Sequence, residues 1–265
     1  TTIEATQAVI EQLQVVKKAM MAELLTRGIP GHHKRFKRTE IGECPEEWTV
    51  VSLGSIIEGG PDNGLYRPQT DYGTGTKIVR IDDFDNGEVL SVKELRRVRV
   101  PDSEIQKFSL RRGDILINRV NSLSHIAKAA LIEEIDEPVL FESNMMRVHV
   151  SEDKIISRFA FLSITAPEAR AFFKSRAKQA IAQASVNQQD VRALAIRLPS
   201  MKEQELISNA IDSVSSRFDA ELEKLQCLQS LKSALMSVLL TGEVRVTADG
   251  VSVGGQAAGG AAPAR

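Results

Sequence analysis

Residues 200–241 contain neither proline nor glycine, and this run limits the possible folds more than any other part of the chain. Forty residues in one α-helix extend roughly 60 Å, which is too long for a single compact core to cover. The sequence therefore predicts a second long helix that packs beside this one. Its apolar residues recur every three or four positions, with a four-residue step after Phe218 that predicts a local break in heptad spacing; they are Ile207, Ile211, Val214, Phe218, Leu222, Leu225, Leu228, Leu231, Leu235 and Leu239.

The predicted partner helix covers residues 1–27, where the chain runs without proline or glycine until Gly28. Residues 10–26 (IEQLQVVKKAMMAELLT) and 225–241 (LQCLQSLKSALMSVLLT) share eight identities in seventeen aligned positions. The match indicates a repeat, although Leu- and Lys-rich helices can also resemble each other by chance. We expect the two helices to pair in an antiparallel, coiled-coil-like way through Val9, Leu13, Val16, Met20 and Leu24 on one side and Leu222, Leu225, Leu228 and Leu235 on the other.

Residues 28–198 separate the two helices and have the pattern of a mixed α+β domain. Runs rich in Ile and Val predict strands at 77–81, 114–117, 125–132, 145–150 and 193–198. Helices are predicted at 154–165 and 167–179. The fold class is therefore α+β: a mixed domain at 28–198, flanked by long helices at 1–27 and 199–244. The Gly- and Ala-rich tail, 245–265, is expected to be disordered.

Two segments of the chain resemble a known family, the specificity subunits of type I restriction–modification systems. The first is AVIEQLQVVKKAMMAELLTRGIPG followed by IGECPEEWTVVSLG; the second is SVNQQDVRALAIRLPSMKEQELISNAIDSV followed by a long helix ending in LLTGEV. Pro199, Glu203 and Gln204 match the family pattern LP-x-x-x-EQ-x-x-I. The likeness covers residues 3–246 but only one target recognition domain. It therefore implies half of a subunit, either natural or a fragment of a longer chain.

The resemblance implies a non-catalytic DNA-recognition subunit that reads one half-site of a bipartite target and docks methyltransferase subunits. Its implied partners are double-stranded DNA, methyltransferase subunits, restriction subunits within the complex, and a second half-subunit or a second copy. No cofactor is expected in this chain. S-adenosylmethionine would belong to the methyltransferase, and ATP and Mg²⁺ to the restriction subunit.

Two alternatives from other classes stay open. A Mg²⁺-dependent nuclease could use Asp102, Glu152 and Lys154, because two carboxylates and a lysine can hold the ion and an attacking water. A coiled-coil scaffold without DNA function would need only the helices. The chain has no phosphate-binding loop and no zinc pattern, so we expect no metal site. It has two isolated cysteines and no run of eighteen apolar residues, which fits a cytoplasmic protein without a membrane span.

The DNA-binding candidates are concentrated in polar loops and basic runs, although the net charge is only −1. The segment Asn118 to His125 resembles the NR-x-NS connection of target recognition domains. Its arginine could bind guanine and its Asn121 could bind adenine in the major groove. Residues 27–38 contain five Arg or Lys and no acid, which suits phosphate contacts. The full candidate set for DNA is Tyr66, Arg67, Lys77, Arg80, Asn118, Arg119, Asn121, Ser122, Ser124, His125, Lys128, Asn187 and Gln188, with Lys34, Arg35, Lys37 and Arg38 for phosphates.

Overall fold

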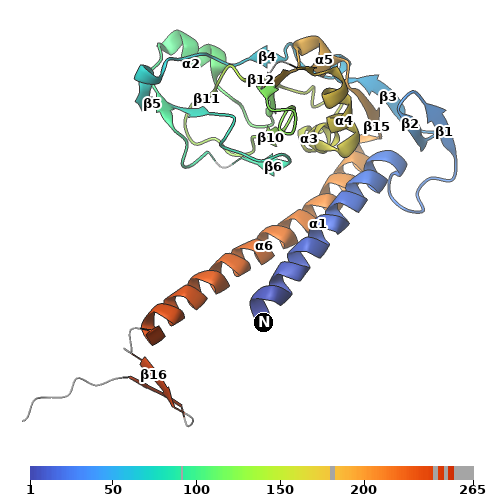
Figure 1. Ribbon diagram of the computed structural model, residues 1–265. Coiled ribbons are helices and arrows are strands. Elements are labelled where there is room, and N and C mark those ends of the chain that lie inside the picture. The colour runs from blue at the N-terminus through green and yellow to red at the C-terminus, as the bar shows by residue number, and fades with distance from the viewer. Residues whose placement is uncertain (91, 180–182, 241–243, 248–249, 254–265) are drawn as a thin grey trace, which may run out of the picture. The chain divides into compact units, whose positions relative to one another are not determined.

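The computed structural model describes residues 1–240, 244–247 and 250–253, except 91 and 180–182 (Figure 1). The chain forms two compact units, one of Thr1–Lys17 with Ser213–Arg265 and the other of Lys18–Asp212. Helices α1 (Thr2–Arg27) and α6 (Met201–Leu240) each contribute residues to both units. The predicted fold class is confirmed, because a mixed domain is accompanied by long N-terminal and C-terminal helices that pack together.

In the first unit, α1 and α6 run antiparallel. The pKa of Glu4 is lowered mainly by its hydrogen bonds to the amino terminus and Thr1, and also by the nearby charge of Lys232. The beginning of α1 therefore lies beside the last turns of α6. Every third or fourth residue of α1 is covered, which is the spacing of a helix seam; the covered residues in this unit are Ile3, Thr6, Ile10, Leu13 and Lys17.

The seam on α6 differs from the predicted stripe at one position. Glu221 is only 4% exposed, whereas the neighbouring Leu222 is 37% exposed. The three-residue step from Phe218 to Glu221 keeps the heptad spacing, so the predicted break is absent. Arg217 and Lys224 pair with the Glu221 carboxylate at 2.6 and 3.2 Å, which compensates its burial.

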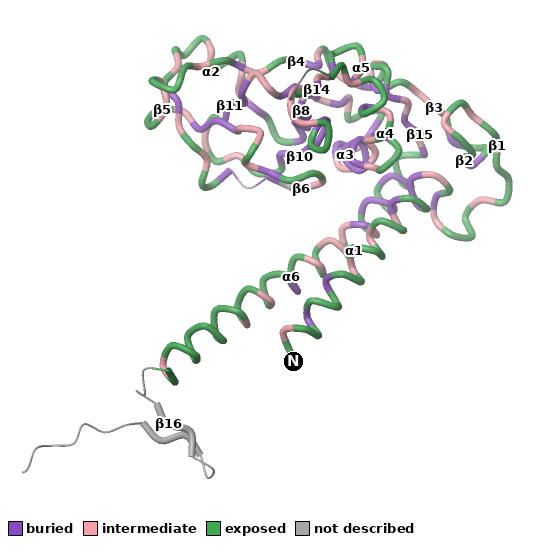
Figure 2. The backbone as a smooth tube through the Cα atoms, viewed as in Figure 1, coloured by how far each residue is buried: buried purple, intermediate pink, exposed green. Residues whose placement is uncertain are grey.

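The other residues predicted to pair the helices differ in their exposure to solvent. Leu13, Leu225 and Leu228 are half-buried, while Val9, Val16 and Leu235 are exposed. The seam repeats every seven residues through Ile10 and Lys17, which turns Val9 and Val16 away from it. Most of α6 beyond Asp212 is exposed (Figure 2).

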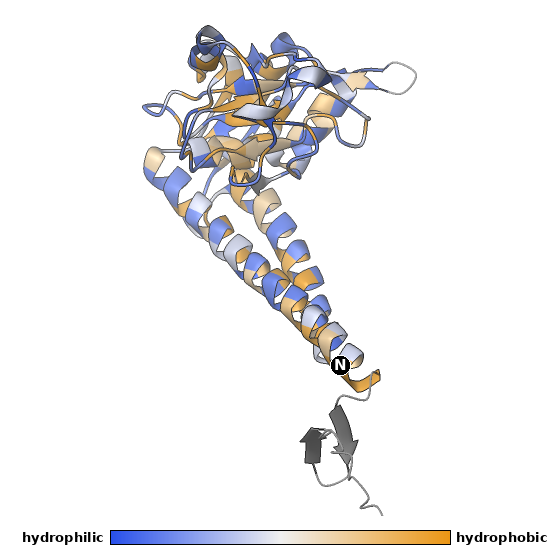
Figure 3. Ribbon diagram, turned by 90° about the vertical axis from the view of Figure 1, so that its left-hand side faces the viewer, coloured by the Kyte–Doolittle hydropathy of each residue, from blue (hydrophilic) through white to orange (hydrophobic). Residues whose placement is uncertain are grey.

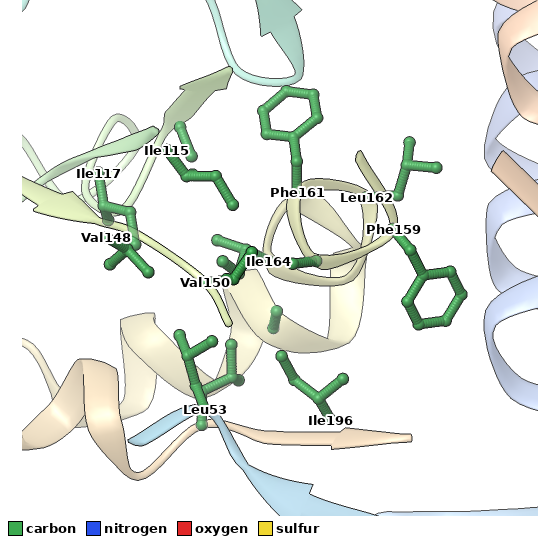
Figure 4. Close-up of a cluster of buried hydrophobic side chains, with 14 of the residues drawn as sticks. Leu53, Ile115, Ile117, Val148, Val150, Phe159, Phe161, Leu162, Ile164 and Ile196 are labelled. Atoms are coloured by element: carbon green, nitrogen blue, oxygen red, sulfur yellow. The ribbon is translucent and has the colours of Figure 1, made fainter. Parts of the chain in front are cut away.

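The Lys18–Asp212 unit is built on a five-stranded sheet with both faces covered. Ile115 and Ile117 point to one face, where α3 packs, and Leu116 points to the other. Figure 4 shows the first of these clusters, with Phe161 and Ile164 of α3 beside Ile115 and Val150. In strand order the sheet is β4 (Asp62–Asn63), β12 (Met145–Val148), β8 (Ile115–Asn118), β10 (Ala129–Leu131) and β6 (Glu88–Val89).

Smaller sheets surround this core, and apolar residues are concentrated in the strands of the unit (Figure 3). Three-stranded sheets comprise β11 (Val139–Phe141), β5 (Tyr72–Val79) and β7 (Arg97–Val98), and β13 (Lys178–Gln179), β14 (Ala184–Ser185) and β9 (Val120–Asn121). Strand pairs are β15 (Ala195–Leu198) with β3 (Thr49–Ser52), and β1 (Phe36–Thr39) with β2 (Gly42–Pro45). The shorter helices are α2 (Asp102–Phe108), α3 (Ser157–Thr165), α4 (Pro167–Arg176) and α5 (Gln188–Arg192), with single 3-10 turns at Leu53–Ser55 and Gln69–Asp71.

α6 ends at Leu240, before the predicted limit at 244, and β16 (Val244–Thr247) pairs with β17 (Gly250–Val253) at the start of the predicted tail, 245–265. The rest of the tail lies outside the described residues, and its disorder stays a prediction.

Glu203 and Gln204, the residues of the EQ motif, join several segments of the Lys18–Asp212 unit. Glu203 accepts hydrogen bonds from Trp48 Nε1 at 2.9 Å and pairs with His33 Nε2 at 2.7 Å. Gln204 is fully buried and accepts from the backbone N–H of Ile156 at 2.8 Å. Gly28 ends α1 with φ of +77°, and a side chain there would lie 2.7 Å from Glu203 Oε1. The motif therefore fixes the end of α1 and the start of α6 on the domain.

Candidate nucleic-acid interface

A tight turn at 142–145 is the centre of the candidate interface. The turn joins β11 to β12 and is closed by a hydrogen bond from Met145 N to Glu142 O at 3.1 Å. On one side, Leu65 and Ser143 are joined by a 2.9 Å backbone hydrogen bond. On the other side, Arg119 N donates to Asn144 O at 2.8 Å. Two polar loops that are distant in sequence, one carrying Tyr66 and one following Arg119, are thus anchored to the same turn.

The first loop carries Tyr66 and lies within residues 59–71, which lead through β4 and a 3-10 turn to β5; it is held at its start. Gln188 Nε2 donates to Pro61 O at 2.5 Å, and Arg192 donates to the carbonyls of Gly59 and Gly60. The next residues form β4, which pairs with β12 and is held in place by it. The loop is therefore a fixed part of the domain surface rather than a free connection.

Tyr66 is the most exposed residue of this loop among the DNA-binding candidates. Tyr66 is 77% exposed, although Leu65 before it is buried. Arg67 after it forms an ion pair with Glu104 of α2. A large aromatic side chain presented between two anchored neighbours can stack on a base or pack in a groove.

The second loop follows Arg119 and contains a cluster of small polar side chains. Ser122 Oγ lies 2.8 Å from His125 Nδ1 and 3.0 Å from Ser124 Oγ. Asn121 lies on β9, which pairs with β14, and its Oδ1 accepts from Ser122 N at 2.8 Å. Arg119 Nη1 donates to Ser143 O at 3.3 Å. The structure thus brings these five predicted residues together next to the central turn.

Helix α4 adds positive charge beside the second loop. Arg170 Nη2 donates to Ser124 O at 2.8 Å, and burial lowers the pKa of Arg170. Lys174 of α4 and Lys178 of β13 are exposed. Residues 169–189 contain four basic and no acidic residues, but the sequence alone does not indicate that Arg170 holds the loop.

Several candidates have structural roles instead. Lys77 is 4% exposed and lies 3.3 Å from Asp136 and 3.0 Å from Glu137. The pKa of Glu137 falls to about 2, because Arg97 and then Lys77 donate hydrogen bonds to it. Asn118 is fully buried at the end of β8, so it does not face the interface.

Three further candidates, Lys128, Arg80 and Asn187, also contact other parts of the protein. Lys128 is 7% exposed and lies 5.0 Å above the ring of Phe84. Arg80 Nε pairs with Glu142 at 3.3 Å. Asn187 caps α5 in a capping box with Asp190, so its side chain is already engaged in holding the helix.

The basic linker is only partly available for phosphates. Arg35 Nε pairs with Glu46 at 2.8 Å, and Lys37 donates to the Glu46 carbonyl at 2.8 Å. Lys34 and Arg38 are exposed and have no ion-pair partner in the part of the chain that the structure describes. These two cations are the stronger candidates of the four.

The residues of the nuclease alternative are each used elsewhere. Asp102 begins α2, Glu152 accepts from Ser157 Oγ at 3.1 Å, and Lys154 Nζ donates to Ser55 O at 3.4 Å. Within the described ranges, no three His, Cys, Asp or Glu side chains are grouped so that they could hold a metal ion. Among those same residues, none of the helices has the length and hydropathy needed to span a bilayer.

Comparisons with known proteins agree on one family. Residues 45–233 match the model for the type I restriction modification DNA specificity domain. The chain is 29% identical over 250 residues to the type I restriction enzyme MjaVIII specificity subunit of Methanocaldococcus jannaschii, covering 89% of this chain and 55% of that one. It is 24% identical over 260 residues to the EcoBI specificity subunit of Escherichia coli, covering 91% and 53%. The chain thus spans about half the length of the curated relatives it matches.

Solved structures with low sequence identity have the same fold. The type I restriction–modification S subunit from M. genitalium superposes with a TM-score of 0.57 at 11% identity, over 88% of this chain and 55% of that one. The HsdS subunit from Thermoanaerobacter tengcongensis gives a TM-score of 0.54 at 14% identity, over 89% and 53%.

Proposed function

The chain belongs to the type I restriction–modification DNA specificity domain family, and from this premise we propose that its Lys18–Asp212 unit reads one half-site of a bipartite DNA target. The observation that carries the proposal is the anchoring of two polar loops on the turn at 142–145. Reading bases requires side chains held in one register, and phosphate contacts require cations nearby. Tyr66, Arg119 and the Ser122 cluster supply the first, and Lys174 and Lys178 beside the second loop supply the second. Lys34 and Arg38 add exposed cations on the linker before the domain.

The family is one of non-catalytic specificity subunits, so chemistry is assigned to other subunits. In this proposal the paired helices dock methyltransferase subunits, which supply S-adenosylmethionine, and restriction subunits with ATP and Mg²⁺ join through the complex. A second half-subunit or a second copy completes the bipartite target. A cytoplasmic location stays a prediction.

The proposal is tested by measuring binding of the full chain to duplex DNA. The duplexes come from a randomised pool, and affinity is then followed as a function of salt. We expect the pool to yield a short enriched sequence. We also expect Arg119→Ala to weaken binding to that sequence by about 1–3 kcal/mol and relax one position, because a bidentate guanine contact is lost.

The matched control replaces Lys34 and Arg38 with alanine. Loss of phosphate contacts should weaken binding to all sequences equally and reduce the slope of log K against log salt by about 2. Binding without any salt dependence or sequence enrichment would contradict the proposal and favour the scaffold alternative. Cutting of the pool by the isolated chain in Mg²⁺ would instead favour the nuclease alternative.

A further inference from the structure

We infer that Asn144 is a specificity-determining residue that reads the major-groove edge of an adenine; this inference rests on the proposed DNA-reading function. Asn144 was not among the residues that the sequence pointed to. It is one of the two central residues of the 142–145 turn, with Ser143 as the other.

The position of Asn144 places it between the two loops of the interface. Ser143, next to it, is bonded to Leu65 of the Tyr66 loop. The Asn144 carbonyl accepts from Arg119 N at 2.8 Å and from Val120 N at 3.3 Å. If Arg119 or Tyr66 contacts one base of the DNA, the adjacent base would therefore lie next to Asn144.

The turn is rigid, which a base-reading amide requires. Glu142 is 8% exposed, and its carboxylate accepts from Ile81 N at 2.8 Å and pairs with Arg80. Its own N–H donates to Val79 O at 3.0 Å. Met145, at the other end, is fully buried in the core. Because both ends are fixed, Asn144 loses little further backbone freedom when it binds.

The Asn144 side chain is free to make new hydrogen bonds. It is half-buried, and its amide forms no hydrogen bond with any residue that the structure describes. Neither amide atom is among the fully buried unpartnered polar atoms, so both reach solvent. The other asparagines near the turn differ. Asn118 is buried, Asn121 already bonds to Ser122, and Asn63 lies on β4 opposite Met146.

The chemistry of the amide selects the base. An asparagine side chain offers one acceptor and one donor in a plane, which matches N6–H and N7 of adenine. Changing the NH₂ to an oxygen removes the donor to N7. An aspartate in the same place accepts from the N4 amine of cytosine instead.

The experiment compares sequence preferences of the full chain, selected from a randomised duplex pool, for the unchanged protein, Asn144→Ala and Asn144→Asp. We expect Asn144→Ala to lose about 10- to 100-fold of the preference for A·T at one position, with other positions unchanged. Asn144→Asp should shift that same position toward cytosine. Asn209→Asp, on α6, adds the same charge outside the turn and should leave the profile unaltered.

The outcomes separate this inference from the function on which it rests. If the unchanged chain enriches a sequence and both Asn144 variants enrich the same one with equal strength, the inference is overturned while the proposed function stands. If the unchanged chain enriches no sequence, the proposed function fails and the inference fails with it. A uniform loss of affinity in the Asn144 variants, without a change at one position, also overturns the assignment to base reading.

Discussion

Met21, Leu24 and Leu25 of α1 align with Met236, Leu239 and Leu240 of α6 in the seventeen-residue repeat, yet their surroundings differ. The first three are 9%, 6% and 6% exposed and belong to the core of the Lys18–Asp212 unit. Their counterparts are 50%, 44% and 81% exposed. The same apolar pattern at the end of a helix is therefore compatible with full burial or with open solvent.

What distinguishes the two helix ends is the set of groups around them. The end of α1 is followed by Gly28 and held through His33 and Glu203, and α3, α4 and β15 lie around Met21 and Leu25. For the end of α6, no such residues are found in the described part of the chain. The exposed apolar residues at the end of α6 are the surface that the proposed second half-subunit or second copy would cover.

The comparison is tested most strongly by shortening one leucine in each copy. Leu24→Ala should lower the free energy of unfolding by about 2–5 kcal/mol, because it leaves a cavity in a packed core. Leu239→Ala should change it by less than about 0.5 kcal/mol, since that side chain is already exposed. Urea unfolding followed by the fluorescence of Trp48, the only tryptophan, measures both. Equal losses would contradict the distinction between the two ends.

A second experiment examines the seam between α1 and α6. Leu225→Asp places an unpaired carboxylate at a half-buried seam position, and we expect it to weaken the helix pair by about 1–3 kcal/mol. Leu222→Asp, three residues away and exposed, should have little effect. Hydrogen exchange of the helix amides reports the pairing, while Trp48 fluorescence should show the domain still folded. If Leu222→Asp were the more disruptive variant, the seam would follow the stripe predicted from the sequence.

The smallest expected effect concerns the contacts of His33 with Glu203 and Glu47, which hold the end of α1. Burial lowers the pKa of His33, but the hydrogen bonds and charges of Glu203 and Glu47 outweigh it and raise the pKa above 6.5. The protonated form is thus favoured in the folded state. The stabilisation is complete below pH 6.5 and is lost as the pH rises through the folded-state pKa.

We expect the free energy of unfolding to fall between pH 6 and pH 8.5 by at most about 1 kcal/mol. In His33→Gln this decrease should disappear, because glutamine does not titrate. Parallel urea titrations at the two pH values measure the difference. An identical decrease in both proteins would show that the titration of His33 does not stabilise the end of α1.

The longer helices and most core strands could be predicted because their signals are local. Ile115 to Ile117 form a continuous apolar run, as expected for a strand buried on both faces, and α1 has its predicted end at Arg27. β11 was missed because its three apolar residues follow an acidic, proline-containing segment. α2 was missed because none of its residues is buried, which leaves no clear apolar period.

The candidate site was predictable only in part. The residues from Arg119 to His125 stand out because small polar side chains occur between two strands. Asn144 and Arg170 do not, since their roles depend on backbone contacts between segments distant in sequence. In the same way, Lys77 and Lys128 resemble phosphate ligands until the fold places carboxylates and an aromatic ring beside them.

The clamp of α5 on the 59–71 segment has a consequence for engineering. Gln188 and Arg192 grip this loop through the main-chain carbonyls of residues 59–61, which every amino acid possesses. The clamp itself therefore places no demand on side chains further along. Other contacts do: a Cβ at Gly64 would lie 2.3 Å from the carbonyl oxygen of Glu142, and Gly73 has a φ of +118°. Arg67 pairs with Glu104, and Tyr72 begins β5. The exposed positions Tyr66, Pro68, Gln69 and Thr70 are thus natural sites at which residues can be varied on a stem that stays the same.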